Sequence, residues 1–177
     1  MEKIDKKLLM PFILTFAVII ADQITKCLVV KYIEPWTIGA QFFGDILRIV
    51  RVANNGVAFS MGDSLSLIGR RLCFGLVPII IMGLVIGVYF RNKEFTMLQR
   101  WAICGVVGGG IGNIIDRIFR VEGVIDFIDV KFYGIFGLQR WPTFNVADMA
   151  VVICGIMLII SFVVITIQQK KNEGDKQ

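Results

Sequence analysis

Residues 97–119 read MLQRWAICGVVGGGIGNIIDRIF, an apolar stretch that carries polar residues near its two ends. At about 1.5 Å per residue, a helix of this length crosses the roughly 30 Å of hydrocarbon in a bilayer. Its glycines predict a small-residue face on which a neighbouring helix can approach closely: Gly105, Gly108, Gly109, Gly110 and Gly112. We therefore expect residues 97–119 to form a closely packed transmembrane helix.

Three further apolar stretches flank this one, at about residues 8–30, 71–90 and 144–167. Hydrophobic residues make up 56% of the 177-residue chain and charged residues only 19%, and the mean hydropathy is +0.74. A soluble domain of this size could not bury so much apolar surface, because small domains keep a large surface relative to their volume. The sequence therefore predicts an all-α membrane protein with four transmembrane helices in a single domain over residues 1–177.

Residues 32–69 lie between the first two apolar stretches and are too polar, and too often interrupted by glycine, to cross the membrane. Within them, residues 45–52 are rich in β-branched side chains, which predicts a short strand or hairpin on the outer surface. Such an element can cover a site at the membrane interface. The charged tail at residues 170–177 is expected to be disordered.

The positive charges indicate how the spans are oriented. Lys and Arg are dense in the N-terminal tail, in the connection between the second and third spans, and in the C-terminal tail. Because cytoplasmic segments carry an excess of Lys and Arg, we expect both termini to be cytoplasmic. The charges behind the net +5 lie at span edges rather than on one long polar face, which favours anionic lipid headgroups over nucleic acid as partners.

The absence of histidine excludes Ser-His-Asp and Cys-His catalysis. The four cysteines fall in separate apolar stretches without a CxxC pair, so they do not indicate a metal site. We interpret them as small core or lipid-facing residues. The sequence contains no evidence for a metal or an organic cofactor.

Ionisable side chains near the hydrocarbon need an explanation, because each costs at least a few kcal/mol there. Asp22 and Lys26 are four residues apart and share a helix face, so an ion pair at the interface explains them as well as a functional role does. Asn113, Asp116 and Arg117 occupy one or two successive turns near the end of the third span. A structural network of Asp116 with Arg117 or Asn113 is favoured over a catalytic Asp116.

Asp126 follows the third span among apolar residues, and Asp148 stands one turn into the fourth. Two carboxyl groups held together in such surroundings tend to share one proton. One can then act as a base on water while the other polarises a carbonyl. The alternative is that Asp148 caps the fourth span and that Asp126 is an exposed loop acid like Asp129. The spacing alone does not show that the two carboxyl groups meet.

Five motifs stand in order along the chain: DQITK at 22–26, NNGVAFS at 54–60, GNIIDR at 112–117, VIDF at 124–127 and FNVAD at 144–148. With them, the chain resembles the bacterial lipoprotein signal peptidases (signal peptidase II) over essentially its whole length. The resemblance implies a four-helix aspartic endopeptidase of the cytoplasmic membrane, with an outer β-cradle and an active site toward the extracytoplasmic side. Such an enzyme removes the signal peptide of a prolipoprotein just before the diacylglyceryl-modified cysteine. The implied partners are lipid-modified prolipoproteins, membrane phospholipids and globomycin-type inhibitors.

The resemblance also implies roles for individual residues. The catalytic aspartates of the family fall on Asp126 and Asp148, and its other polar site residues, which would shape the pocket and hold substrate backbone, fall on Asp22, Asn54, Asn113, Asp116, Arg117 and Asn145. We assign Lys26 a structural role. The stretch between Arg117 and Asp126 is one residue longer than expected for the family, and Val57 stands where alanine is common.

Two other functions are compatible with four apolar spans. A small proton-coupled transporter subunit predicts Asp and Asn residues along one helix face through the midplane, whereas here they gather near one end of the spans. A non-catalytic lipid-binding subunit predicts that substitution of Asp148 is tolerated. If the chain is a peptidase, we expect the segment 32–69 to move over the site and to control lipid entry, so that a crosslink across it would slow cleavage.

Overall fold

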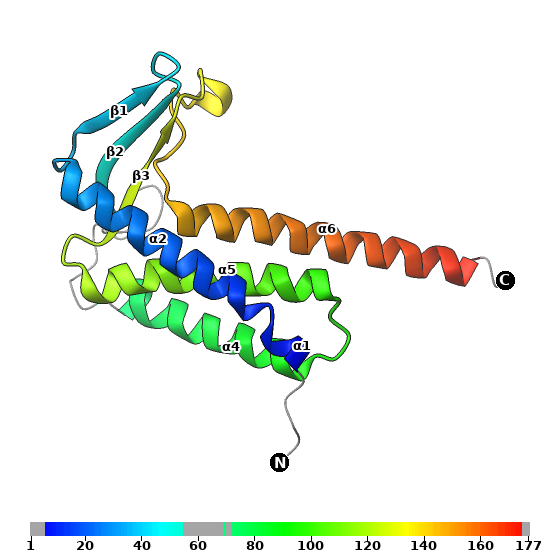
Figure 1. Cartoon of the computed structure of the whole chain (residues 1–177). Helices are drawn as coiled ribbons and strands as arrows, with labels where there is room; N and C mark the ends of the chain where they lie inside the picture. The colour runs from blue at the N-terminus through cyan, green and yellow to red at the C-terminus, as the bar shows by residue number, and fades with distance from the viewer. Residues whose placement is uncertain (1–5, 55–68, 70–71, 175–177) are drawn as a thin grey trace.

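The computed structural model describes residues 6–54, 69 and 72–174 (Figure 1). The described part of the chain contains four helices long and apolar enough to cross a membrane. They are α2 Phe12–Tyr32, preceded by the short α1 Lys6–Leu9; α4 Val77–Arg91, preceded by the π-helical turn η1 Leu72–Leu76; α5 Met97–Phe119; and α6 Val146–Gly174. The predicted four spans are confirmed.

Two helix ends show how local chemistry sets the bounds. Thr96 forms a capping box with Gln99, in which each side chain bonds the backbone N–H of the other, so α5 begins at Met97 as predicted. The prediction of a disordered tail from Lys170 is wrong for residues 170–174, because α6 continues to Gly174. Residues 168–173 contain no Gly or Pro and include the strong helix formers Gln, Lys and Glu, so nothing in them stops the helix. Residues 175–177 lie outside the described part.

Helix α5 lies at the centre of the bundle, and most of its span is buried, whereas the other three spans are largely exposed at the surface of the model. Its glycines allow this arrangement. A Cβ on Gly108 would lie 2.9 Å from the carbonyl oxygen of Thr15 in α2, and a Cβ on Gly109 would overlap the carbonyl oxygen of Ala147 in α6. The predicted small-residue packing face is confirmed.

A three-stranded antiparallel sheet lies at one end of the helices, and both termini lie toward the opposite end (Figure 1). Its strands are β1 Ile38–Phe42, β2 Leu47–Asn54 and β3 Val124–Val130, in the order β1-β2-β3. The strand predicted within residues 45–52 is confirmed as part of β2. The third strand comes from the connection between α5 and α6 and was not predicted, although its sequence VIDFIDV is rich in β-branched residues.

Part of the predicted outer segment cannot be compared with the structure. Residues 55–68 lie outside the described residues, and with them lies the NNGVAFS motif from residue 55 onward. Asn54, the first residue of that motif, ends β2 and is described. The expected movement of the segment over the site therefore stays a prediction.

Candidate active site

Asp126 lies in β3, where it pairs with Val52 of β2, and its side chain is only 3% exposed. Asn54 donates from Nδ2 to the carboxylate Oδ2 at 3.1 Å, and Asn145 donates from Nδ2 to Oδ1 at 2.7 Å. The carboxyl group is thus held from the neighbouring strand and from the start of α6. The interpretation of Asp126 as an exposed loop acid is wrong.

The pKa of Asp126 is raised from 3.8 to about 6, chiefly because the group is buried and also because the negative charge of Asp148 lies nearby. The hydrogen bonds from Asn54 and Asn145 act in the opposite direction, because they stabilise the ionised carboxylate. Since the pKa is raised, Asp126 keeps its proton up to about pH 6 and loses it above. A carboxyl group of this kind can change its protonation state near neutral pH, as acid–base catalysis requires.

Asp148 occupies the first turn of α6 and forms a reciprocal capping pair with Asn145. The backbone N–H of Asp148 donates to Asn145 Oδ1 at 2.9 Å, and the backbone N–H of Asn145 donates to Asp148 Oδ2 at 3.1 Å. The other carboxylate oxygen of Asp148 accepts from Asn113 Nδ2 at 2.7 Å. The interpretation of Asp148 as a helix cap is therefore confirmed, and the cap also fixes the direction of the carboxyl group. The positive end of the α6 dipole favours its negative charge.

Asn145 joins the two carboxyl groups, because its side chain donates to Asp126 and its backbone N–H donates to Asp148. Its Nδ2 also lies 3.1 Å from Asn113 Oδ1, so three elements meet at this fully buried amide. Asp126 is buried, whereas Asp148 is partly exposed. The structure thus brings a buried acid and a more accessible acid into one hydrogen-bonded cluster.

Beneath this cluster lies a buried ion network centred on Lys26. The Lys26 ammonium lies 2.8 Å from Asp22 Oδ2, 2.9 Å from Asp116 Oδ2 and 3.0 Å from Asn113 Oδ1. The side chains of Asp22, Lys26 and Asp116 are fully buried. Asp116 also pairs with Arg120, whose Nε lies 2.9 Å from Oδ1. The predicted ion pair of Asp22 with Lys26 is confirmed, and both of its side chains are buried inside the bundle.

Each acid of this network also binds the backbone next to a candidate catalytic residue. Asp22 Oδ1 accepts from the backbone N–H of Ala147 at 3.0 Å, one residue before Asp148. Asp116 Oδ2 accepts from the backbone N–H of Ile125 at 3.3 Å, one residue before Asp126. The network therefore fixes the backbone on which both candidate catalytic residues stand, which fits a role for Asp22 and Asp116 in shaping the site.

The predicted contact between Asp116 and Arg117 does not form among the described residues, where Asp116 pairs with Lys26 and Arg120. Helix geometry explains the difference, since Arg120 is four residues after Asp116 and lies on its face, whereas Arg117 is the next residue and points elsewhere. Arg117 is half-buried, and the charges that act on it most strongly are those of Asp148 and Asp126. Among the described residues it makes no hydrogen bond or ion pair within bonding distance.

Gln23 was missed by the sequence analysis. Its Nε2 lies within hydrogen-bonding distance of Asp22 Oδ2, the Gly112 carbonyl and Asp116 Oδ1, at 3.1, 3.1 and 3.2 Å. It thus links α2 to α5 beside the ion network. The signal was its place in the DQITK motif, directly after Asp22.

The two hydrogen bonds to Asp126 lead to a prediction about pH. Replacing Asn54 by alanine removes a bond that lowers the pKa of Asp126, so the ionisation near pH 6 should move to higher pH. The measurement is the pH dependence of kcat/KM, which reports the ionisations of the free enzyme. Gln41→Ala, which removes an exposed amide from β1, is the matched control and should leave the profile unchanged. An unshifted profile for Asn54→Ala would contradict the assignment of this ionisation to Asp126.

Known proteins resemble this chain over most of its length. Residues 14–164 match the model of the family described as Signal peptidase (SPase) II. The chain is 49% identical over 163 residues to the lipoprotein signal peptidase of Treponema pallidum (strain Nichols), which covers 92% of this chain and 88% of that one. It is 47% identical over 162 residues to the lipoprotein signal peptidase of Treponema denticola, with 92% and 93% covered.

The fold is also shared with a solved structure. A protein described as a bacterial membrane enzyme has a TM-score of 0.76 and 28% identity, over 89% of each chain. The matched family region includes Asp126 and Asp148. The chain therefore belongs to the signal peptidase (SPase) II family, the membrane aspartic peptidases that remove signal peptides from prolipoproteins.

Proposed function

We propose that this chain hydrolyses the peptide bond just before the diacylglyceryl-modified cysteine of a prolipoprotein, with Asp126 and Asp148 as its catalytic pair. The observation that carries the proposal is the bridge through Asn145, which hydrogen-bonds to both carboxyl groups at 2.7 and 3.1 Å. A pair of carboxyl groups in one partly dry site can activate water without a metal ion or a covalent nucleophile.

The two acids have different surroundings, which suggests a division of roles. Asp126, with its raised pKa, holds the proton and donates it to the scissile carbonyl oxygen. Asp148, at the positive end of α6, takes a proton from water, and the resulting hydroxyl adds to the carbonyl carbon. The tetrahedral intermediate then collapses: the C–N bond breaks, the proton on Asp148 passes to the leaving amine, and Asp126 regains its own. Both acids return to their starting states.

The other implied site residues divide by burial. Asp22 and Asp116 are fully buried in the ion network, so we assign them the positioning of Ala147 and Ile125 rather than contact with substrate. Asn113 and Asn145 orient the two carboxyl groups, and Asn54 restrains Asp126 from the sheet. Arg117 is the cation that we assign to substrate backbone carbonyls. Globomycin-type inhibitors are expected to bind at the same place.

The assignment of Arg117 leads to a prediction that separates binding from structure. Arg117→Ala should raise KM about 10-fold or more, since a hydrogen bond from a charged group contributes about 1.5–3 kcal/mol. The thermal unfolding midpoint should change little, because Arg117 makes no close ion pair with the described residues. The matched control is Arg120→Ala, which removes the partner of Asp116 and should lower the midpoint. A loss of stability in Arg117→Ala with an unchanged KM would show that Arg117 is structural.

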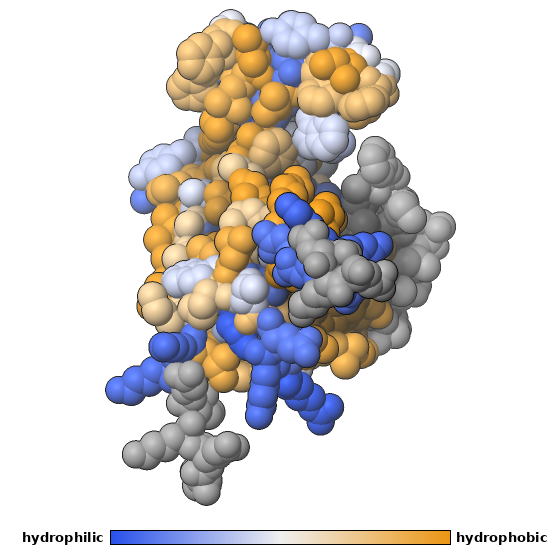
Figure 2. Space-filling model, turned by 90° about the vertical axis from the view of Figure 1, so that its right-hand side faces the viewer, coloured by the Kyte–Doolittle hydropathy of each residue, from blue (hydrophilic) through white to orange (hydrophobic). Residues whose placement is uncertain are grey.

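We also propose that both termini are cytoplasmic and that the site faces the extracytoplasmic side. Basic residues stand at the helix ends near the termini, namely Lys6, Lys7, Arg91, Lys170 and Lys171. Figure 2, which views the molecule from this end, shows hydrophilic side chains there. At the sheet end, several of the described Arg and Lys residues are paired with acids, as in Arg51 with Glu122 and Arg140 with Asp129. This asymmetry follows the excess of Lys and Arg in cytoplasmic segments, and anionic phospholipids would meet the basic end.

The mass of the released product tests the proposed bond. With a diacylglyceryl-modified prolipoprotein in lipid micelles, the mature product should begin at the modified cysteine. A product that begins at any other residue would contradict the proposed position of cleavage.

A further inference from the structure

A closed turn at residues 132–139, which we name the aromatic turn, leads from β3 toward α6 and contains the 3-10 turn η2 Ile135–Gly137. Its backbone is closed by hydrogen bonds from Phe132 N to Gln139 O at 2.8 Å and from Gly134 N to Leu138 O at 2.9 Å. Despite this order, its apolar side chains point outward: Tyr133 is 62% exposed, and Phe136 is 87% exposed. The backbone of the turn is thus ordered, whereas its Tyr133 and Phe136 side chains are exposed.

The backbone of the exposed aromatic residues makes their presence more costly. Tyr133 and Phe136 both have φ of 53°, and Phe43 in the β1–β2 turn, 81% exposed, has φ of 54°. This left-handed region favours glycine and costs other residues about 1–2 kcal/mol. In water, neither the strain nor the exposed ring would be compensated. The free energy gained when the rings enter an apolar surrounding would offset both the backbone strain and the cost of exposing the rings.

Charged contacts hold the aromatic turn and the β1–β2 turn together at the tip of the sheet. Lys131 donates from its backbone N–H to the Ile46 carbonyl at 2.8 Å, and its ammonium lies 2.8 Å from Asp45 Oδ1. Arg140 donates from Nη2 to the Asp45 carbonyl at 3.0 Å and from Nε to Asp129. The tip is therefore a rigid unit on the strand that carries Asp126 at its other end.

The tip of the sheet lies beside the apolar surface of α6 that would face lipid. Figure 1 shows that the sheet extends sideways from the helix ends, past α6, and that the aromatic turn lies on the side of the sheet that faces along α6. The adjoining surface of α6 is exposed and apolar, with Val152, Ile153 and Ile156 each more than half exposed. Figure 2, which views the sheet along the helices from the far end, shows a largely apolar surface over the tip. The apolar surface of the tip thus continues the lipid-facing surface of the span.

We propose that the aromatic turn is an interfacial anchor that inserts Tyr133, Ile135 and Phe136 into the headgroup and upper acyl region of the adjacent leaflet. Aromatic side chains are favoured at this depth, because their rings are apolar while a polar group such as the tyrosine hydroxyl can stay among the headgroups. The Lys131 ammonium, which is paired with Asp45, lies 5.2 Å from the centre of the Tyr133 ring, so charged groups stand beside the inserted ring at the level of the lipid headgroups. With the tip held at the membrane, β3 fixes the depth of Asp126 relative to the bilayer.

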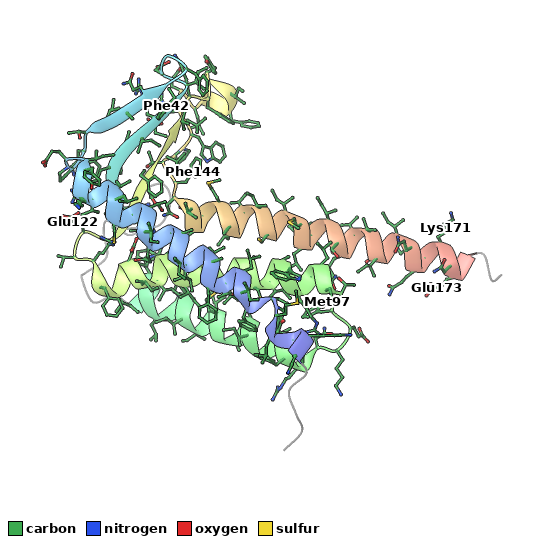
Figure 3. The ribbon with its side chains drawn as sticks, viewed as in Figure 1. Phe42, Met97, Glu122, Phe144, Lys171 and Glu173 are labelled. Carbon is green, nitrogen blue, oxygen red and sulfur yellow. The ribbon has the colours of Figure 1, made fainter. Side chains whose placement is uncertain are left out.

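Photo-crosslinking in lipid nanodiscs tests the anchor. The photoreactive p-benzoylphenylalanine replaces Phe136 in one sample of the full chain, Ile153 of α6 in a second and Val121 in a third. Ile153, on the exposed apolar surface of α6, is the lipid-facing reference. Val121 is a fully exposed apolar residue at the other end of β3, next to Glu122, which Figure 3 labels. After irradiation, mass spectrometry measures the protein fraction that carries a phosphatidylglycerol or phosphatidylcholine adduct.

The adduct yield at position 136 should be close to that at 153 and several-fold above that at 121. A yield at 136 no higher than at 121 would overturn the anchor. A crosslink from 136 to a second copy of the chain, in place of lipid, would also overturn it and identify the tip as a contact between copies. Should the chain with the probe at 136 fail to fold, the same probe at Tyr133 gives the same comparison. None of these results depends on peptidase activity.

Discussion

Asp126→Asn and Asp148→Asn should each lower the cleavage rate by about 10³-fold or more, because an asparagine can neither take a proton from water nor give one to a carbonyl oxygen. At position 126 the change also turns one carboxylate oxygen into an amide that faces the Nδ2 donor of Asn54 or Asn145. At position 148 the asparagine oxygen can still accept from the Asn145 backbone, so the helix cap is retained. Single-turnover cleavage of a lipidated precursor measures the rates.

The double variant of these two residues should be hardly slower than either single variant, since residues that act as one unit show strongly non-additive effects. The matched control is Asp129→Asn, which changes a buried acid on the same strand that pairs with Arg140 rather than with the site. Its activity should stay close to that of the unchanged protein. Independent, multiplicative losses in the double variant would show that the two aspartates do not work as a pair.

Lys26→Met should destabilise the protein by about 3–5 kcal/mol, because it leaves two buried carboxylates without their shared counter-charge. Activity should fall with it, since Lys26 also donates to Asn113, which holds Asp148. Thermal unfolding in micelles and cleavage by the folded fraction are the two measurements. Lys31→Met, an exposed lysine later on the same helix, is the control and should behave like the unchanged protein.

A second substitution sharpens this prediction. In Lys26→Met, Asp116 keeps its ion pair with Arg120, whereas Asp22 loses its cation. Adding Asp22→Asn to Lys26→Met removes that unpaired charge, so part of the lost stability should return. An unchanged unfolding midpoint in Lys26→Met would show that the buried network does not stabilise the bundle.

The spans and the small-residue face could be predicted because they depend on local composition. The bounds of α5 follow from its apolar run and from the capping box at Thr96, both of which are read directly along the chain. Strand β3 was missed because a short run of five apolar residues and two aspartates after a helix has the same composition whether it forms a strand or a connection. Its partner β2 lies some 70 residues earlier, and only the tertiary fold brings the two together.

The residues of the candidate site could be proposed from the sequence, but the contacts among them could not. The chain order indicates that Asp22 can meet Lys26, because they are four residues apart on one helix. It does not indicate that Asp116 joins them from another helix, nor that Arg120 rather than Arg117 completes the set. For Asp148, the cap and the catalytic role were treated as alternatives, whereas a carboxyl group that caps α6 can also belong to the proposed catalytic pair, since its second oxygen bonds to Asn113.

The most direct test of the central claim is a gel-shift assay with the purified protein in lipid micelles, in which a diacylglyceryl-modified prolipoprotein is offered beside the same precursor without its lipid. We expect cleavage of the lipidated precursor alone, and we expect Asp126→Asn and Asp148→Asn to abolish it while the protein stays folded. Cleavage by either folded variant at the rate of the unchanged protein would contradict the claim that these two aspartates, joined through Asn145, form the catalytic pair.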